Sequence, residues 1–202
     1  MAGHEQLLSA VPSEIRELLV DKLNQTENWP ELVAALEEAA SRGEVVLWHI
    51  AYMIARSRPS DLDVMTKRML LENEDYALRA AKKFGWVDVR SQEFVDWVLP
   101  MRLISEPLTN YRPFFWRIVL EEVGECDDPL TAAKILGAWV YEHLSFSYAE
   151  PSNISPIGIY ESGYGSCGDY SILYCALART AGIPTRIVVD RGEDHQWNEV
   201  LI

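Results

Sequence analysis

The order of apolar and polar residues predicts that the chain is almost entirely helical up to about residue 124. Apolar residues recur there at spacings of three and four, which is typical of helices that bury one face. Ser13 is expected to cap one helix. Asn28 and Pro30 should begin the next one, and Gly43 should follow its end. Further helices are expected near residues 61–72, 73–84, 91–99 and 113–123, with breaks at Gly85 and Pro100.

Two stretches of this region differ from the amphipathic pattern. Residues 44–55 are apolar on most sides, so their helix should be buried. Residues 94–116 are rich in aromatics, including Trp97 and Trp116. These rings could form a lip over a substrate groove, or they could seat the helical region on the next domain. Because Trp and Phe mostly serve packing, the packing interpretation is favoured.

From Asp128 onward the pattern changes to alternating helices and strands. A helix is expected over 129–144, capped by Asp128 and opened by Pro129. A long loop should span 145–166, followed by an apolar helix that starts at Cys167 and ends before Pro184. Strands are expected at 186–189 and 195–202. We therefore expect an α+β protein with a helical region over 1–125 and a second region over 126–202.

Composition narrows the range of partners. The 202 residues include 18 basic and 31 acidic side chains, a net charge of −13. Such an acidic surface argues against non-specific binding to nucleic acid or to anionic membranes. No apolar run reaches membrane-spanning length, and residues 1–11 lack the features of a secretion signal. We expect a soluble protein, either cytoplasmic or exported with its signal removed.

The cysteines and histidines do not suggest a disulfide framework or a metal site. Cys126, Cys167 and Cys175 are odd in number and irregular in spacing. Cys167 and Cys175 share one predicted helix and would lie roughly 12 Å apart along its axis, too far for a disulfide. The histidines, at positions 4, 49, 143 and 195, show no spacing typical of metal ligands. We predict no metal and no cofactor.

Cys167 and His195 are the candidate catalytic residues. Glycines at 163, 165 and 168 place Cys167 on a tight turn entering a helix. The N–H groups of a helix N-terminus stabilise a thiolate, and they can hold the oxyanion formed when it attacks a carbonyl. If the following hairpin lies across the start of the helix, the His195 imidazole can reach the sulfur and later protonate the leaving group.

Each of these residues also has a non-catalytic interpretation. Buried cysteines are mostly inert, and we take Cys126 and Cys175 as structural. A redox-sensing thiol on a helical scaffold would leave the surroundings of His195 unexplained. The conjunction of a glycine-flanked cysteine, a Gly-Ile-Pro turn and the run 194–200, Asp-His-Gln-Trp-Asn-Glu-Val, favours catalysis.

This conjunction resembles the transglutaminase-like superfamily of papain-type cysteine enzymes over about residues 127–202. Residues 165–170 are similar to the cysteine motif of bacterial members, and residues 194–200 to the histidine motif of transglutaminases and peptide N-glycanases. The resemblance implies a Cys-bearing helix against an antiparallel sheet, with Cys167 as nucleophile and His195 as base. As candidates for binding the substrate or the oxyanion we name Tyr164, Gly165, Ser166, Gly168 and Trp197.

The third residue of the family's triad, an Asp that orients the histidine, has no match in this sequence. Glu199 is four residues along the same strand, about 13 Å from His195, and Asp194 should point to the other face. Because two strands alone are marginal, we expect a missing C-terminal segment or a partner to complete the sheet.

The predicted function is cysteine-dependent acyl transfer on peptide or protein amides, as a protease, an amidase or a transglutaminase-type enzyme. The alternative is a non-catalytic binding module that recognises its partner through the helical region.

Overall fold

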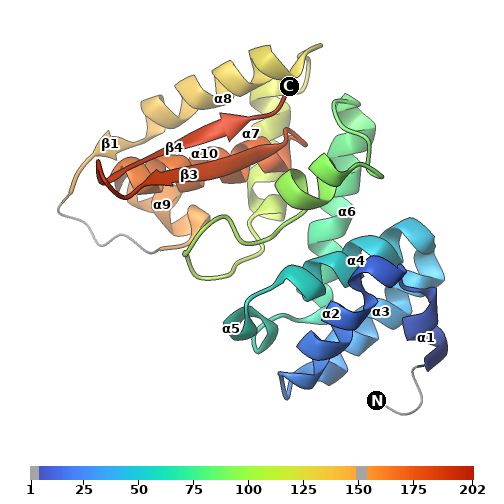
Figure 1. The fold of residues 1–202 in the computed structure, drawn as a ribbon. Helices are drawn as coiled ribbons and strands as arrows, with labels where there is room; N and C mark the ends of the chain where they lie inside the picture. Colours follow the sequence, from blue (N-terminus) through green and yellow to red (C-terminus); the bar gives the residue numbers. More distant parts are fainter. Residues whose placement is uncertain (1–4, 149–153) are drawn as a thin grey trace. The chain divides into compact units, whose positions relative to one another are not determined.

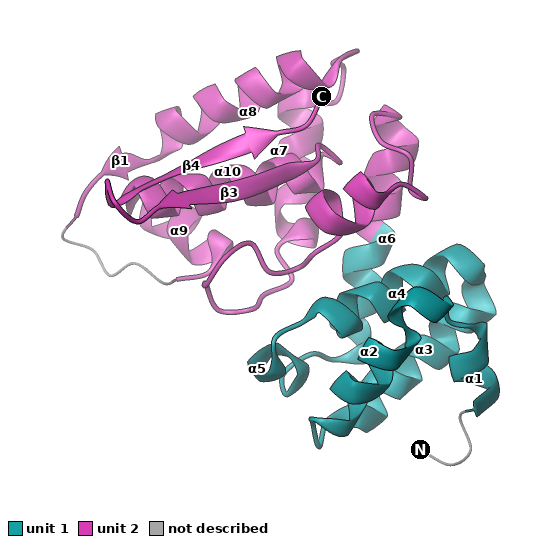
Figure 2. Cartoon of the chain, in the orientation of Figure 1, with its two compact units in different colours: residues 1–75 teal, residues 76–202 magenta. Residues whose placement is uncertain are grey.

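The computed structural model describes residues 5–148 and 154–202. The chain forms two compact units, residues 1–75 and residues 76–202 (Figure 2). The predicted boundary between residues 125 and 126 lies inside unit 2, and it stays a prediction about where the Cys-bearing core begins.

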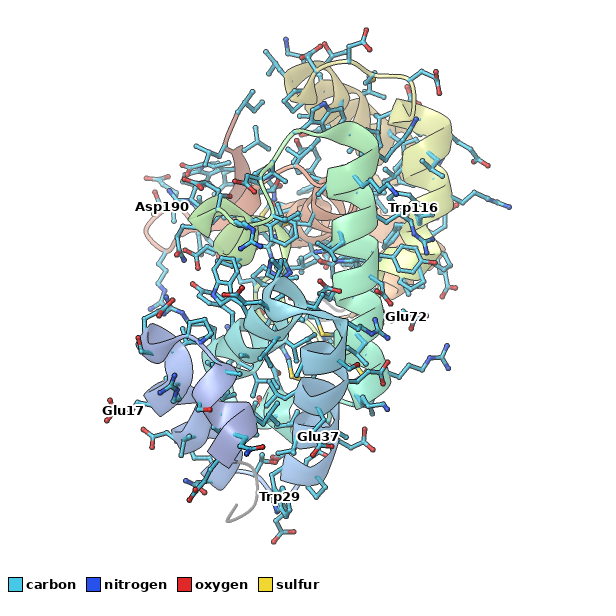
Figure 3. All side chains as sticks on the ribbon, turned by 90° about the vertical axis from the view of Figure 1, so that its right-hand side faces the viewer. Glu17, Trp29, Glu37, Glu72, Trp116 and Asp190 are labelled. Carbon is cyan, nitrogen blue, oxygen red and sulfur yellow. The ribbon has the colours of Figure 1, made fainter. Side chains whose placement is uncertain are left out.

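Unit 1 is helical, as the apolar spacing predicts. Its main helices are α2 (Ser13–Asn24), α3 (Trp29–Arg42) and α4 (Glu44–Arg56), preceded by α1 (Glu5–Ala10) and followed by α5 (Pro59–Leu62) and the start of α6 (Lys67–Phe84). Both α2 and α3 pack on α4, which is buried over most of its length. Acidic side chains such as Glu17 and Glu37 extend outward from these helices (Figure 3).

The expected helix ends are confirmed at Gly43 and wrong at Ser13. Gly43 follows α3 with a φ of 124°, in the region that favours glycine. Ser13, by contrast, is the first residue of α2, Pro12 occupies the cap position, and no side-chain cap forms there. Proline fixes φ near the value that starts a helix, so the chain turns into α2 without a hydroxyl cap.

The segments between residues 61 and 99 differ from the prediction. Instead of two helices over 61–72 and 73–84, a short α5 ends at Leu62 and one 18-residue helix, α6, runs to Phe84. No glycine or proline interrupts α6, so nothing in its sequence breaks the helical hydrogen-bond ladder. In place of the helix expected over 91–99, η1 (Phe94–Val98) is a five-residue π-helix.

Unit 2 is built around α10 (Cys167–Thr180), whose residues from Ile172 to Thr180 are buried apart from Tyr174. It packs against α7 (Arg112–Val123), α8 (Pro129–His143), α9 (Pro156–Ser162) and the hairpin of β3 (Thr185–Asp190) and β4 (His195–Val200) (Figure 1). The predicted cap of α8 is confirmed, since the Asp128 side chain accepts a hydrogen bond from the Thr131 backbone N–H at 2.9 Å.

Two small sheets complete this unit. β3 and β4 are antiparallel, with Ile187 opposite Asn198 and Asp190 opposite His195. Asp190 lies at the turn end of the hairpin (Figure 3). The expected loop over 145–166 is wrong in part, because it contains α9 and two short strands, β1 (Ser145–Phe146) and β2 (Tyr164–Gly165), which pair in parallel. A mainly helical unit followed by a helix against an antiparallel hairpin confirms the α+β class.

The hairpin is anchored to α10 by a buried arginine. Arg179 is 4% exposed, and its guanidinium donates hydrogen bonds to the backbone carbonyls of Thr185, Pro100 and Arg102 at 2.9, 3.3 and 3.1 Å. These bonds join the end of α10 to the start of β3 and to the segment after η1. Phe94 in η1 is itself fully buried. That the aromatic segment seats the helical region on the next domain stays a prediction.

Candidate functional site

The turn before Cys167 is shaped by glycines whose conformations and neighbours exclude larger residues. Gly163 follows α9 in the left-handed region, with a φ of 71°. At Gly165 an added Cβ would lie 2.5 Å from the Cβ of Asp169, far inside van der Waals contact. A side chain at position 165 would therefore push α10 away from the turn, and glycine keeps the two close.

Ser166 and Asp169 fix the first turn of α10. The Ser166 backbone N–H and hydroxyl both donate to Oδ2 of Asp169, at 2.8 and 3.0 Å. Asp169 is the third residue of the helix, so this is the carboxylate half of a capping box. It makes Cys167 the first helical residue, where the backbone N–H groups have no partners within the helix.

Cys167 and His195 line the same cavity, as the sequence predicts. The cavity has a volume of about 540 Å³ and lies between α8, the first turns of α10 and β4. Trp197, a predicted substrate residue, also lines it. The hairpin therefore brings the two candidate catalytic residues, 28 positions apart in sequence (195 − 167), to one site.

The alternation along β4 decides which side chains face α10. The Asn198 amide donates to the Ser171 carbonyl at 3.0 Å. The Gln196 amide lies over Gly168, where an added Cβ would be 3.2 Å from its Oε1. Since side chains alternate along a strand, His195, Trp197 and Glu199 occupy the other face of β4. The rings of His195 and Trp197 lie 6.2 Å apart.

No hydrogen bond joins Cys167 to His195 within residues 5–148 and 154–202, so their direct contact stays a prediction. Glu199 does not contact His195 and so does not orient its ring, as expected from their separation along β4. Its carboxylate instead accepts hydrogen bonds from the Arg186 guanidinium, at 2.6 and 2.9 Å.

The remaining predicted residues shape the site from outside the cavity. Gly165 and Ser166 form the turn, and Gly168 makes room for Gln196. Tyr164 is 52% exposed and belongs to β2. Their roles in binding the substrate or the oxyanion stay predictions.

Sequence reasoning missed Gln196, whose amide lies on the first turn of α10 beside Cys167. The sequence feature that could have indicated Gln196 is Gly168, because a glycine at the second position of a helix makes room for a neighbouring polar group. Oε1 of Gln196 is buried and has no hydrogen-bond partner among the described residues.

Two tyrosines of α10 form rigid walls of the cavity. The Tyr170 hydroxyl donates to the Leu144 carbonyl at 2.5 Å, and the Tyr174 hydroxyl donates to the Ala133 carbonyl at 3.3 Å. Burial raises the pKa of Tyr174 to about 12, and burial also raises the pKa of Tyr170. Both phenols are therefore neutral at physiological pH and present apolar ring surface to the site.

The other two cysteines differ from Cys167 in their surroundings. Cys175 is fully buried, and burial raises the pKa of its thiol. The pKa of Cys126 is raised by burial and then by the nearby carboxylates of Asp128 and Asp127. Both shifts disfavour the thiolate, so these two thiols should react slowly.

Within the described residues, no group of three or more His, Cys, Asp or Glu side chains could hold a metal ion. None of the helices in that part of the chain is long and apolar enough to cross a membrane.

Comparison with known proteins finds a family match in the C-terminal part of the chain. Residues 118–202 match the family model of the transglutaminase-like superfamily. No curated protein matches the sequence. Among solved structures, a proposed cysteine protease from Cytophaga hutchinsonii is similar, with a TM-score of 0.46 and 16% identity over 59% of this chain. The match spans 42% of that protein's length.

Proposed function

We propose, because residues 118–202 match the family model of the transglutaminase-like superfamily, that this protein is a cysteine-dependent acyl-transfer enzyme acting on peptide or protein amides. Cys167 is its nucleophile, and His195 is its general base and acid. The observation that supports the proposal is that both residues line one cavity, with Cys167 as the first residue of α10.

The proposed reaction has two steps. The Cys167 thiolate attacks the amide carbonyl carbon, a C–S bond forms, and the carbonyl oxygen becomes an oxyanion beside the free N–H groups at the start of α10. The C–N bond then breaks, and the imidazolium of His195 protonates the departing amine. Water or a second amine attacks the thioester, loses a proton to His195 and releases the acyl group, which regenerates the thiolate.

We also propose that a further strand adds to β4 and supplies the carboxylate that orients His195. β4 pairs only with β3 within the described residues, so its second edge has unpaired backbone groups. No aspartate or glutamate of those residues lines the cavity. Glu199 is held by Arg186 and cannot take this role.

The experiment that tests the proposed function traps the acyl-enzyme. Incubation with a p-nitrophenyl ester of a short acyl group should add one acyl group to Cys167, as measured by intact mass and peptide mapping. Hydroxylamine should remove it, because thioesters react with this amine. We expect Cys167→Ser to form no thioester, and His195→Ala to slow acylation about 10²- to 10⁴-fold, the usual contribution of a general base.

Matched controls separate this chemistry from general thiol reactivity. In Cys126→Ser, Cys167 should be acylated at the rate of the unmodified protein, because the Cys126 thiol takes part in neither step of the reaction. Equal acylation of Cys126 and Cys167, or an unchanged rate in His195→Ala, would contradict the proposal. These outcomes would favour the binding module. This alternative is supported by the position of His195, because the face of β4 that packs on α10 carries Asn198 and His195 lies on the other face.

A further inference from the structure

A second cavity, of about 430 Å³, lies on the opposite side of α8 from the Cys167 cavity. We call it the aromatic groove and define it by its main lining residues: Phe114, Arg117, Glu122, Trp139, His143 and Tyr160. Trp139 and His143 are one turn apart on α8, whereas Gly137, Val140 and Tyr141 of the same helix line the Cys167 cavity. The two cavities share no lining residue, so the groove is independent of the proposed acyl transfer.

Aromatic rings form the walls of the groove. His143 stacks on Trp139 with ring centroids 3.8 Å apart, and Trp139 stacks on Tyr160 at 5.5 Å. Phe114, which is 40% exposed, meets Tyr160 edge to face at 5.8 Å. The stacked His143 ring covers one face of Trp139, which is only 6% exposed, so the accessible ring surface belongs mainly to Phe114 and the partly buried Tyr160. The π faces of such rings attract cations.

The polar groups of the groove also favour a cation. Glu121 and Glu122 both line it, and its one basic residue, Arg117, is paired with Glu121 at 3.4 Å. Glu122 forms no ion pair among the described residues. The Nδ1 of His143 lies 2.8 Å from the Trp139 carbonyl, which can only accept, so Nδ1 carries the proton. In the neutral ring the second nitrogen, Nε2, is then an acceptor.

We propose that the aromatic groove binds a small organic cation with a methylated ammonium group. The methyl groups pack on the rings of Tyr160 and Phe114, and the positive charge is balanced by Glu122. A chain with a net charge of −13 adds a long-range attraction for any cation. An anion would meet two carboxylates in the groove, and a neutral ligand would gain from the rings only their apolar surface.

The test is a titration by isothermal calorimetry with choline and with 3,3-dimethylbutan-1-ol, which replaces the ammonium nitrogen by carbon at nearly the same shape. We expect choline to bind with a dissociation constant at or below about 1 mM, and about tenfold more tightly than the alcohol. Glu122→Gln should weaken choline binding several-fold and leave the alcohol unaffected. Tyr160→Leu should weaken choline more than the alcohol, because leucine keeps apolar surface and loses the π face.

A matched control is Glu142→Gln, which removes an exposed carboxylate of α8 that does not line the groove. It should bind choline as the unmodified protein does. Equal affinities for choline and the alcohol, no heat of binding with choline, or equal losses in Glu122→Gln and Glu142→Gln would each overturn the proposal. None of these results depends on Cys167, so the proposed enzyme activity is tested separately.

Discussion

Replacing Arg179 by alanine is expected to lower the free energy of unfolding of unit 2 by about 3 to 5 kcal/mol. The side chain is 96% buried (100% − 4%), and it donates to three backbone carbonyls on two segments outside α10. Its removal takes a charged donor away from each of these carbonyls and opens a cavity behind β3. The Pro100 carbonyl keeps the Tyr111 hydroxyl at 3.5 Å, and the Thr185 carbonyl keeps the Cys175 thiol at 3.7 Å. The measurement is chemical denaturation followed by far-UV circular dichroism.

Arg179→Ala should also alter the candidate site, because the hairpin that Arg179 anchors carries His195. β3 begins at Thr185, which accepts the hydrogen bond from Nε of Arg179, and β4 carries His195. We therefore expect slower alkylation of Cys167 in Arg179→Ala even under conditions where the protein stays folded. Arg191→Ala is the matched control, because Arg191 is exposed in the turn of the same hairpin. Equal unfolding midpoints for the two variants would contradict this account of Arg179.

Replacing Glu74 by alanine should destabilise unit 1 by about 3 to 5 kcal/mol. Oε1 of Glu74 lies 3.2 Å from Nδ1 of His49, and both side chains are fully buried. Breaking a buried pair removes a charged hydrogen-bond partner from the surviving polar group in a medium of low dielectric constant. The measurement is again denaturant unfolding, compared with Glu72→Ala, which removes a partly exposed carboxylate of the same helix.

A double variant, His49→Leu with Glu74→Leu, separates the pair from simple packing. Buried pairs replaced by apolar residues of similar volume are often neutral, so we expect this protein to be more stable than Glu74→Ala alone. The single variants His49→Leu and Glu74→Leu complete the comparison. If the double variant loses as much stability as the sum of the losses in these two single variants, the two side chains do not interact as described.

Local signals in the sequence predict the helices and the hairpin well where capping or helix-ending residues mark the ends of the elements. Gly43 and Asp128 each mark a helix end that the structure confirms. The errors fall where such signals are absent or compete. α6 was expected as two helices although nothing breaks it, and residues 145–166 were expected as loop because their Pro, Ser and Gly content conceals α9. The π-helix at Phe94–Val98 has no local sequence signature of its own.

The sequence predicts the candidate site as a pair of residues, and its roles stay predictions, whereas the surroundings of the pair could not be predicted. The glycine-flanked position of Cys167 and the strand position of His195 are local features, and the structure places both at one cavity. The placement of Gln196 over Gly168 depends on which face of β4 packs on α10. That choice is made by tertiary contacts such as the bond from Asn198 to Ser171, which no local pattern contains. The aromatic groove likewise joins residues of α7, α8 and α9 that are far apart in sequence.

A Cys167–His195 pair is tested by the rate of Cys167 alkylation by iodoacetamide against pH, in the unmodified protein and in His195→Ala. Peptide mapping follows each thiol, and Cys126 and Cys175 serve as internal references. We expect fast labelling confined to Cys167, persisting well below about pH 8.5, the pKa of a free cysteine, and lost in His195→Ala. Labelling of Cys167 that follows a free thiol and is the same in both proteins would contradict a Cys–His pair.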